Sequence, residues 1–181
     1  MDDKGSYYTR ALAALGLPPY KAESEPGQAC EQFGQVALGI AYEYCAWSFA
    51  QRRVVLTTGD GGAVGLPDDC LRVSSCTLEA YELVGRELVS RCGAREFELV
   101  YTTDVYIQRV ALPDGQPMFC EACVLLLAGL IAPRVTEDVR LAEVFHQRGM
   151  MMLAEARLKD AQQVNMQGRG FADRFLGRRD G

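Results

Sequence analysis

The periodicity of the apolar residues changes twice along the chain, and this change constrains the fold more than any other feature of the sequence. Up to Gln51 apolar residues recur every three or four positions, which is typical of helices. From Val54 to Tyr101 they form short runs separated by glycine-rich turns, which is typical of strands. From Pro117 the helical spacing returns. The sequence therefore predicts an α+β, mainly α fold: about four helices with a small antiparallel β region inserted between them.

The expected helices cover residues 6–15, 26–51, 117–134 and 136–165, and the β insertion covers 53–101. We expect residues 1–165 to form a single domain, because 181 residues is a usual length for one core. Within the insertion, Val54–Leu56 and Ala63–Leu66 are expected to pair as a hairpin across the turn at 58–62. Strands are also expected at 71–78, 80–84, 87–91 and 97–101. For residues 102–112 strand, loop and short helix all stay open.

Two helix faces and one helix start can be predicted. In the helix at 26–51 the spacing gives one apolar stripe, formed by Ala29, Phe33, Val36, Ile40, Tyr44 and Trp47. In the helix at 136–165 the expected core face is formed by Val139, Ala142, Phe145, Gly149, Leu153 and Ala156. Thr136 is the expected N-cap of that last helix, with Glu137 and Asp138 in its first turn.

Composition excludes several classes of function. With 19 basic and 24 acidic residues the net charge is -5, so the chain lacks the basic surface of a nucleic-acid binder. No charged segment followed by an apolar one begins the chain, so we expect no secretory signal and synthesis in the cytoplasm. The apolar run from Met118 to Pro133 contains Glu121 and is shorter than a membrane span, which predicts a buried core helix.

Residues that could carry catalysis or bind a metal are few. The single histidine, His146, falls in the middle of an expected helix, where it is more often a surface residue than a base. Cys120 and Cys123 form a CxxC without the second ligand pair that a structural zinc site needs. Asp68 and Asp69 follow Leu66-Pro67, where turn formation or helix capping is the ordinary role. We therefore expect no enzyme, no cofactor and no metal.

The last residues, 166–181, differ in composition from the rest of the chain. Four glycines interrupt them and no sustained apolar periodicity is present, so this segment is predicted to be a flexible tail that folds on a partner. Phe171 and Phe175 would then lie on one side of a helical turn. The candidate partner-binding residues are Arg169, Phe171, Arg174, Phe175, Leu176, Arg178 and Arg179.

Several segments, read in order, resemble the tail tubular protein A and portal-adaptor family of tailed bacteriophages and related gene transfer agents. The resemblance covers Ala11 to about Gln163. The segments that carry it are Ala11–Gly16, Trp47-Ser48-Phe49-Ala50, Leu66–Val73 with the pattern Leu-Pro-x-Asp-x-x-Arg-Val, Tyr81–Arg86, Leu99-Val100-Tyr101, and Phe119-x-Glu121-Ala122 followed by Leu127-Ala128 and Ile131-Ala132. The chain departs from the longer members of the family by its short sheet region and its early end.

The resemblance implies a structural head-to-tail connector of a phage or prophage, located in the virion at the junction of head and tail. Such a subunit assembles into a ring, twelvefold in relatives, that binds the portal protein and a tail tube or nozzle protein. DNA would pass through its lumen without specific binding. Two alternatives stay open: a neck or tail-completion subunit that binds the tail tube, and a small cytosolic metal or redox protein that uses Cys120 and Cys123.

Overall fold

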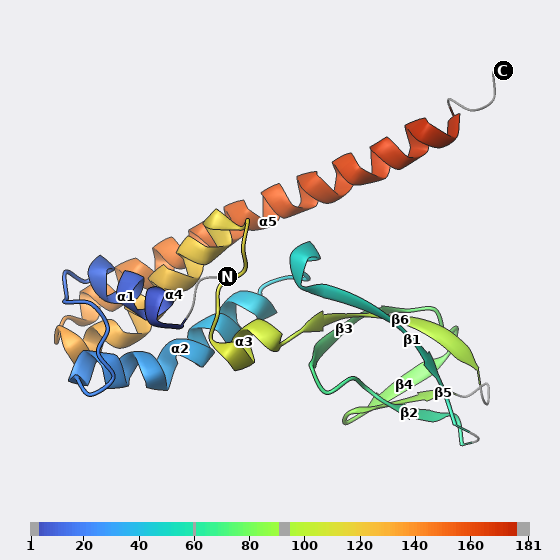
Figure 1. Ribbon diagram of the computed structural model, residues 1–181, viewed down its shortest axis with the longest axis horizontal. Helices are drawn as coiled ribbons and strands as arrows, with labels where there is room; N and C mark the ends of the chain where they lie inside the picture. Colours follow the sequence, from blue (N-terminus) through green and yellow to red (C-terminus); the bar gives the residue numbers. More distant parts are fainter. Residues whose placement is uncertain (1–3, 60, 91–94, 177–181) are drawn as a thin grey trace. The chain divides into compact units, whose positions relative to one another are not determined.

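The chain has an α+β, mainly α fold, with 53% of its residues in helices and 22% in strands. The computed structural model describes residues 4–59, 61–90 and 95–176, and side chains up to residue 164. The chain divides into two compact units: a helical unit, residues 1–48 and 106–181, and a β unit, Phe49–Val105 (Figure 1). The β unit is thus an insertion in the helical unit and includes the residues 53–101 expected from the sequence.

The helical unit contains α1 (Lys4–Ala14), α2 (Glu25–Glu43), α4 (Pro117–Val135) and α5 (Val139–Leu176). Helix α4 packs against α1, α2 and α5, and twelve of its residues are buried. Its apolar composition on all sides explains this central position, because a helix without a polar face has to be covered all round. By length and mean hydropathy, 1.8, α4 could also span a membrane, but 67% of that stretch is buried inside the protein.

Helices α4 and α5 approach closely through two glycines. A Cβ atom added at Gly129 would lie 3.0 Å from the backbone nitrogen of His146, and one added at Gly149 would lie 3.0 Å from the side chain of Leu126. The absence of a side chain at both positions lets the two helices pack with almost no space between them. Phe145, Leu153 and Ala156 continue this buried side of α5, as the sequence predicts, whereas Val139 is 71% exposed.

Helix α2 ends at Glu43, eight residues earlier than predicted. Trp47 causes this difference: its side chain is fully buried, and its indole nitrogen donates a hydrogen bond to the backbone oxygen of Ala41 at 2.8 Å. Its ring meets that of Phe119 edge-to-face, with 4.9 Å between centroids. If the helix continued through residue 47, the side chain of Trp47 could not reach the backbone oxygen of Ala41, which lies six residues earlier.

Ser48, which follows Trp47, attaches the segment after α2 to α5. Ser48 donates hydrogen bonds from its backbone nitrogen, at 3.0 Å, and from its hydroxyl to the carboxylate of Asp160 in α5. Ser48 starts a short 3-10 turn, η1 (Ser48–Ala50), that leads into the β unit.

The apolar stripe predicted for residues 26–51 is confirmed at Ala29 and Trp47 and is wrong at Val36. The buried side consists mainly of small residues, and it is formed by Gly27, Ala29, Cys30, Gly34, Ala37, Leu38, Ala41 and Tyr42. Val36, which was expected on that side, is 49% exposed. Small side chains let α2 pack closely against α1 and α4. A stripe predicted from large apolar residues therefore does not include them.

The β unit contains two three-stranded antiparallel sheets among the described residues. One has the order β1-β6-β3, from Gln51–Thr57, Glu96–Thr103 and Cys70–Cys76; the other has the order β2-β5-β4, from Ala63–Gly65, Glu87–Ser90 and Tyr81–Val84. Their shared core consists of buried apolar residues, Cys70, Leu78, Leu88, Phe97, Leu99 and Tyr101.

The predicted hairpin between Val54–Leu56 and Ala63–Leu66 is wrong. Strand β1 pairs with β6 over its whole length, from Gln51 with Thr102 to Thr57 with Glu96, and β2 pairs with β5. The glycine-rich sequence after β1 predicts a hairpin, but β1 and β2, on either side of it, belong to different sheets. The hairpin at Gly85-Arg86 is as expected, with Val84 opposite Glu87.

The structure settles one segment that the sequence leaves open and corrects one predicted helix start. Residues 102–112 contain the end of β6, then α3 (Val105–Arg109), and then an irregular segment. Thr136 ends α4 and does not begin α5: its backbone nitrogen and its hydroxyl both donate to the oxygen of Ala132. Asp138 is the residue that caps α5, because its carboxylate accepts hydrogen bonds from the backbone nitrogens of Arg140 and Leu141.

Candidate functional site

The candidate partner-binding segment continues α5. This helix was expected to end at residue 165, and its backbone is helical to Leu176, which includes Arg169, Phe171, Arg174 and Phe175. Figure 1 shows α5 running beside α4 and then continuing past it. The side chains of these residues, and Arg178 and Arg179 altogether, lie outside the described part of the chain. Their role as a partner-binding site therefore stays a prediction.

The cysteines of the CxxC motif lie in the core of the helical unit. Cys123 is fully buried, and burial raises the pKa of its thiol well above the ordinary value. The thiol of Cys120 donates a hydrogen bond to the backbone oxygen of Pro113 at 3.2 Å. Metal binding and thiol exchange both require the thiolate, which burial disfavours here. No group of three or more His, Cys, Asp or Glu among the described residues could hold a metal ion.

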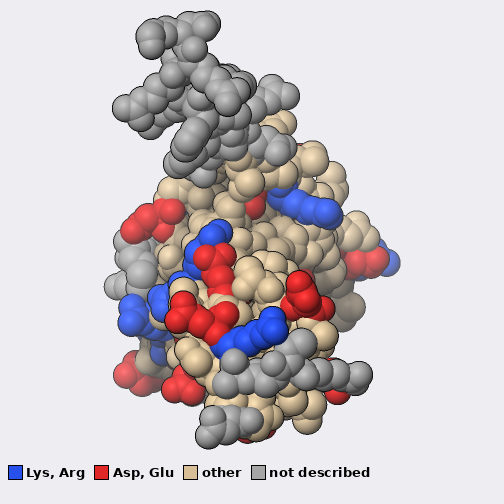
Figure 2. Space-filling model, turned by 90° about the vertical axis from the view of Figure 1, so that its right-hand side faces the viewer, with Lys and Arg blue, Asp and Glu red and all other residues tan. Residues whose placement is uncertain are grey.

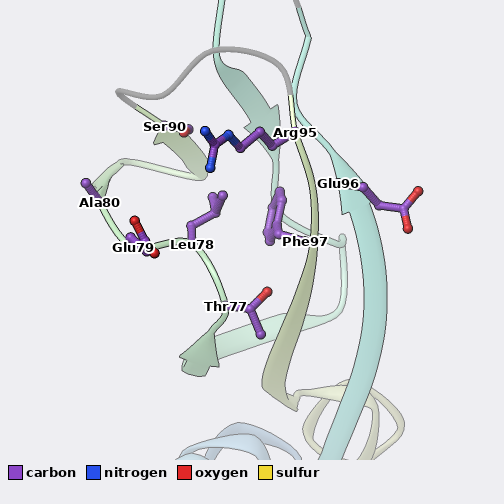
Figure 3. Close-up of a pocket in the computed structure, with 8 residues that line it drawn as sticks. All are labelled: Thr77, Leu78, Glu79, Ala80, Ser90, Arg95, Glu96 and Phe97. Atoms are coloured by element: carbon purple, nitrogen blue, oxygen red, sulfur yellow. The ribbon is translucent and has the colours of Figure 1, made fainter.

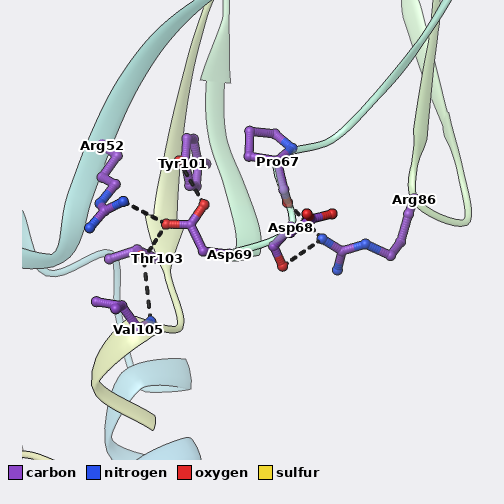
Figure 4. A network of polar contacts seen from close by, with 8 residues as sticks. All are labelled: Arg52, Pro67, Asp68, Asp69, Arg86, Tyr101, Thr103 and Val105. Carbon is purple, nitrogen blue, oxygen red and sulfur yellow. Dashed lines mark hydrogen bonds and ion pairs between the residues drawn. The ribbon is translucent and has the colours of Figure 1, made fainter. Parts of the chain in front are cut away.

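Asp69 lies at the centre of a polar network that joins the three strands of the first β sheet (Figure 4). Its carboxylate accepts hydrogen bonds from the hydroxyls of Tyr101, at 2.9 Å, and Thr103, at 2.8 Å, and it forms an ion pair with Arg52 at 2.8 Å. Partial burial alone would raise the pKa of Asp69. The hydrogen bonds from Thr103 and Tyr101 and the charge of Arg52 outweigh it and lower that pKa.

The neighbouring acid has a different role. The guanidinium group of Arg86, in the β4–β5 turn, donates to the backbone oxygens of Pro67 at 2.7 Å and Asp68 at 3.1 Å (Figure 4). Asp68 and Asp69 thus belong to two separate structural networks and do not form a carboxylate pair. Arg86, through the backbone oxygens of Pro67 and Asp68, and the carboxylate of Asp69 together fix the entry into β3.

We expect Asp69 to contribute to stability in a pH-dependent way. Because the pKa of Asp69 is lower in the folded protein than in the unfolded chain, its contribution is present above about pH 4 and is lost as the pH falls through the folded-state value. Replacing Asp69 by asparagine should therefore lower the unfolding free energy by about 1–3 kcal/mol at pH 7. Urea titrations of both proteins between pH 7 and pH 3 should show this difference shrinking below about pH 4. A difference that stayed constant over this range would contradict the ionised network, and Glu96→Gln, at an exposed position of β6, is the control.

Strand β4 is an exposed edge of the second sheet. Of the described strands it pairs with β5 alone, and all four of its residues are exposed, with Leu83 at 49% and Val84 at 59%. Across the two-residue turn at Gly85-Arg86, Val84 and Glu87 form the hydrogen-bonded pair, so the peptide groups of Leu83 point to the open edge. An apolar edge of this kind is a typical place for strand addition by another chain.

Cavities lie in both units of the described chain. In the β unit a cavity of about 130 Å³ is lined by Leu78, Phe97 and Arg95, whose side chain reaches toward Ser90 (Figure 3). Two more, of about 260 and 360 Å³, are both lined by Gly115, Gln116 and Pro117 at the start of α4. None of these cavities is predicted from the sequence.

The charge on the surface is mixed. Figure 2 shows acidic and basic side chains interspersed on the described residues of one face, where neither sign forms a continuous patch. The clusters of Lys and Arg that phosphate binding requires are not visible among the described residues of this face.

Comparison with known proteins gives no match: neither a protein-family model nor a curated protein corresponds to this chain at a significant level.

Proposed function

We propose that this protein is a structural head-to-tail adaptor of a tailed bacteriophage or prophage, a ring subunit that binds the portal protein and extends the DNA channel toward the tail. It acts by geometry and not as an enzyme, and it is part of the virion after synthesis in the bacterial cytoplasm. Its partners would be the portal, a tail tube or nozzle protein, and further copies of the same chain.

The observation that carries the proposal is the insertion of a self-contained β unit into a helical unit. The insertion begins within Trp47-Ser48-Phe49-Ala50 and continues through Leu66–Val73, two of the segments on which the resemblance to portal adaptors rests. Both segments have special local contacts: Trp47 and Ser48 attach the end of α2 to Phe119 and Asp160, and Asp69 joins three strands.

A ring subunit also needs surfaces that meet a neighbour on two sides. The open edge of β4, with Leu83 and Val84 exposed, is suited to a neighbouring subunit, because backbone hydrogen bonds and apolar contacts would form together. The interspersed charges and the net charge of -5 suit a lumen through which DNA slides without being held.

The proposal is tested by electron microscopy of the full-length protein mixed with the purified portal of the same phage or prophage. We expect closed rings on one end of the portal. A Leu83→Lys variant should form few or no rings, since it places a charge at the β4 edge, whereas Val36→Lys, an exposed site on α2, should form rings normally. The absence of any portal complex with the wild-type protein would overturn the proposal, and binding to the tail tube alone would favour a neck or tail-completion subunit.

The C-terminal segment provides a second test. Ending the chain after Gln167 removes Arg169, Phe171 and Phe175 and should weaken portal binding at least tenfold, or about 1.4 kcal/mol. Thermal stability should be nearly unchanged, because the last buried residue described on α5 is Asp160. Portal affinity is measured by surface plasmon resonance, with Gln162→Ala as the control. Unaltered affinity of the shortened protein would move the docking surface to the helical bundle.

A further inference from the structure

The outer side of α5 carries a regular apolar stripe opposite the side that packs on α4. Val144, Met151 and Leu158 follow one another at intervals of seven residues and are 49%, 66% and 65% exposed. Seven residues are nearly two helical turns, so the three side chains share one face. Ala154 and Ala161 lie on the same face and leave room beside the larger side chains. We call these five residues the outer stripe.

Single exposed apolar residues are common on protein surfaces and need no explanation. The outer stripe differs in two ways. Its large members repeat every seven residues, as in helices that pair with one another. The opposite face of α5 is already buried, through Phe145, Gly149 and Leu153. The inner apolar face of α5 packs within the helical unit, so the outer apolar face is left for another partner.

We propose that the outer stripe binds the same stripe of a second copy of this chain, with the two α5 helices antiparallel about a two-fold axis close to Met151. In this arrangement Met151 meets the Met151 of the other copy, and Val144 lies opposite Leu158. The large side chains then fill the space over Ala154 and Ala161. The interface is isologous, so it closes at two copies and is separate from the ring contact at β4.

The charged residues beside the outer stripe favour pairing with a second copy of the chain, and they favour the antiparallel orientation. In the antiparallel arrangement Arg148 lies opposite Glu155 of the other copy, and Glu143 lies opposite Arg157, and the symmetry axis generates each pair twice. All four side chains are exposed in the single chain and are able to reach a partner. In a parallel arrangement Glu143 would still meet Arg148, but Glu155 and Arg157 would have no opposite charge across the seam. Charge complementarity therefore selects the antiparallel pair.

The interface is small, and its strength follows from its size. Stable complexes bury about 800 Å² on each partner, whereas one stripe of a single helix offers less. We therefore expect a reversible dimer with a dissociation constant on the order of 10–100 μM. This inference is independent of the portal adaptor proposal, because it concerns the free protein alone.

Sedimentation equilibrium of the full-length protein at concentrations between 5 and 300 μM tests the proposal. We expect a monomer–dimer equilibrium in the wild-type protein. Met151→Glu places two like charges at the symmetry axis and should weaken association at least tenfold. Val139→Glu is the matched control, because Val139 is an exposed apolar residue of the same helix outside the outer stripe, and it should leave association unchanged.

A charge exchange tests the direction. Arg148→Glu alone and Glu155→Arg alone each place like charges opposite one another and should weaken the dimer about threefold or more. The double variant restores opposite charges only in the antiparallel pair, and its dissociation constant should return to within about twofold of the wild-type value. A protein that stays monomeric at 300 μM, or a dimer that Met151→Glu leaves intact, overturns the proposal. A double variant as weak as the single ones overturns the antiparallel register.

Discussion

Replacing Trp47 by alanine is expected to lower the free energy of unfolding by about 3–5 kcal/mol, the largest effect that we predict for any single substitution. The side chain is fully buried, contacts Phe119 edge-to-face, and donates a hydrogen bond to the backbone oxygen of Ala41 near the end of α2. Alanine would leave a cavity and would remove the indole donor from the Ala41 oxygen. Urea denaturation followed by far-UV circular dichroism measures the effect.

The graded variant Trp47→Phe separates the two contributions. Phenylalanine restores most of the apolar volume but not the N–H group, so we expect a smaller loss, on the order of 1–3 kcal/mol. Equal losses for Phe and Ala would assign the whole effect to the hydrogen bond. A loss below 1 kcal/mol for Trp47→Ala would mean that Trp47 does not fix the end of α2.

A second large effect is expected at Asp160, where alanine should cost about 2–4 kcal/mol. Asp160 is only 8% exposed, and its carboxylate accepts two hydrogen bonds from Ser48. Hydrogen bonds to a charged group contribute about 1.5–3 kcal/mol, and their loss would leave a half-buried peptide nitrogen of Ser48 without its acceptor.

Asparagine at position 160 keeps one acceptor oxygen and should recover part of the loss, whereas Gln163→Ala, an exposed site one turn further along α5, should change stability by less than about 0.5 kcal/mol. Thermal and urea denaturation of these three variants provide the measurement. If Asp160→Ala were as stable as the wild-type protein, the contact between α5 and the residue after Trp47 would not stabilise the fold.

The sequence was sufficient for elements whose signal is local. The helices at 6–15 and 117–134 lie within two residues of α1 and α4, and the turn at Gly85-Arg86 joins the strands that were expected. In each case the determining pattern, an apolar repeat or a glycine turn, lies within the element itself. The α+β, mainly α class follows from these local signals.

The remaining features depend on partners far away in the sequence. Strand β1 pairs with β6, some forty residues later, and the turn chemistry at 58–62 favoured the nearer but incorrect partner. Helix α2 ends where it does because of Phe119 and Asp160 in α4 and α5. Thr136 and Asp138 are both suitable caps by residue type. The bond from Thr136 back to Ala132 and the bonds that the Asp138 carboxylate accepts distinguish them in the structure.

The candidate sites also combine features that are visible in the sequence with features that only the structure shows. The seven-residue spacing of Val144, Met151 and Leu158 is visible in the sequence, but only the structure reveals that the face they share is the exposed one. The open edge of β4 has no sequence signal of its own, because an edge is defined by the absence of a neighbouring strand.

The two ends of the β unit are neighbours: it enters through β1 and leaves through β6, and Gln51 lies directly opposite Thr102 in that antiparallel pair. A unit whose ends meet can be removed or exchanged without stretching the chain that surrounds it. A short linker between Ser48 and Tyr106 would replace it, and the unit could be transplanted into another helical host. The same exchange can occur in evolution, so we expect related chains to differ in the β unit while they keep the same helices.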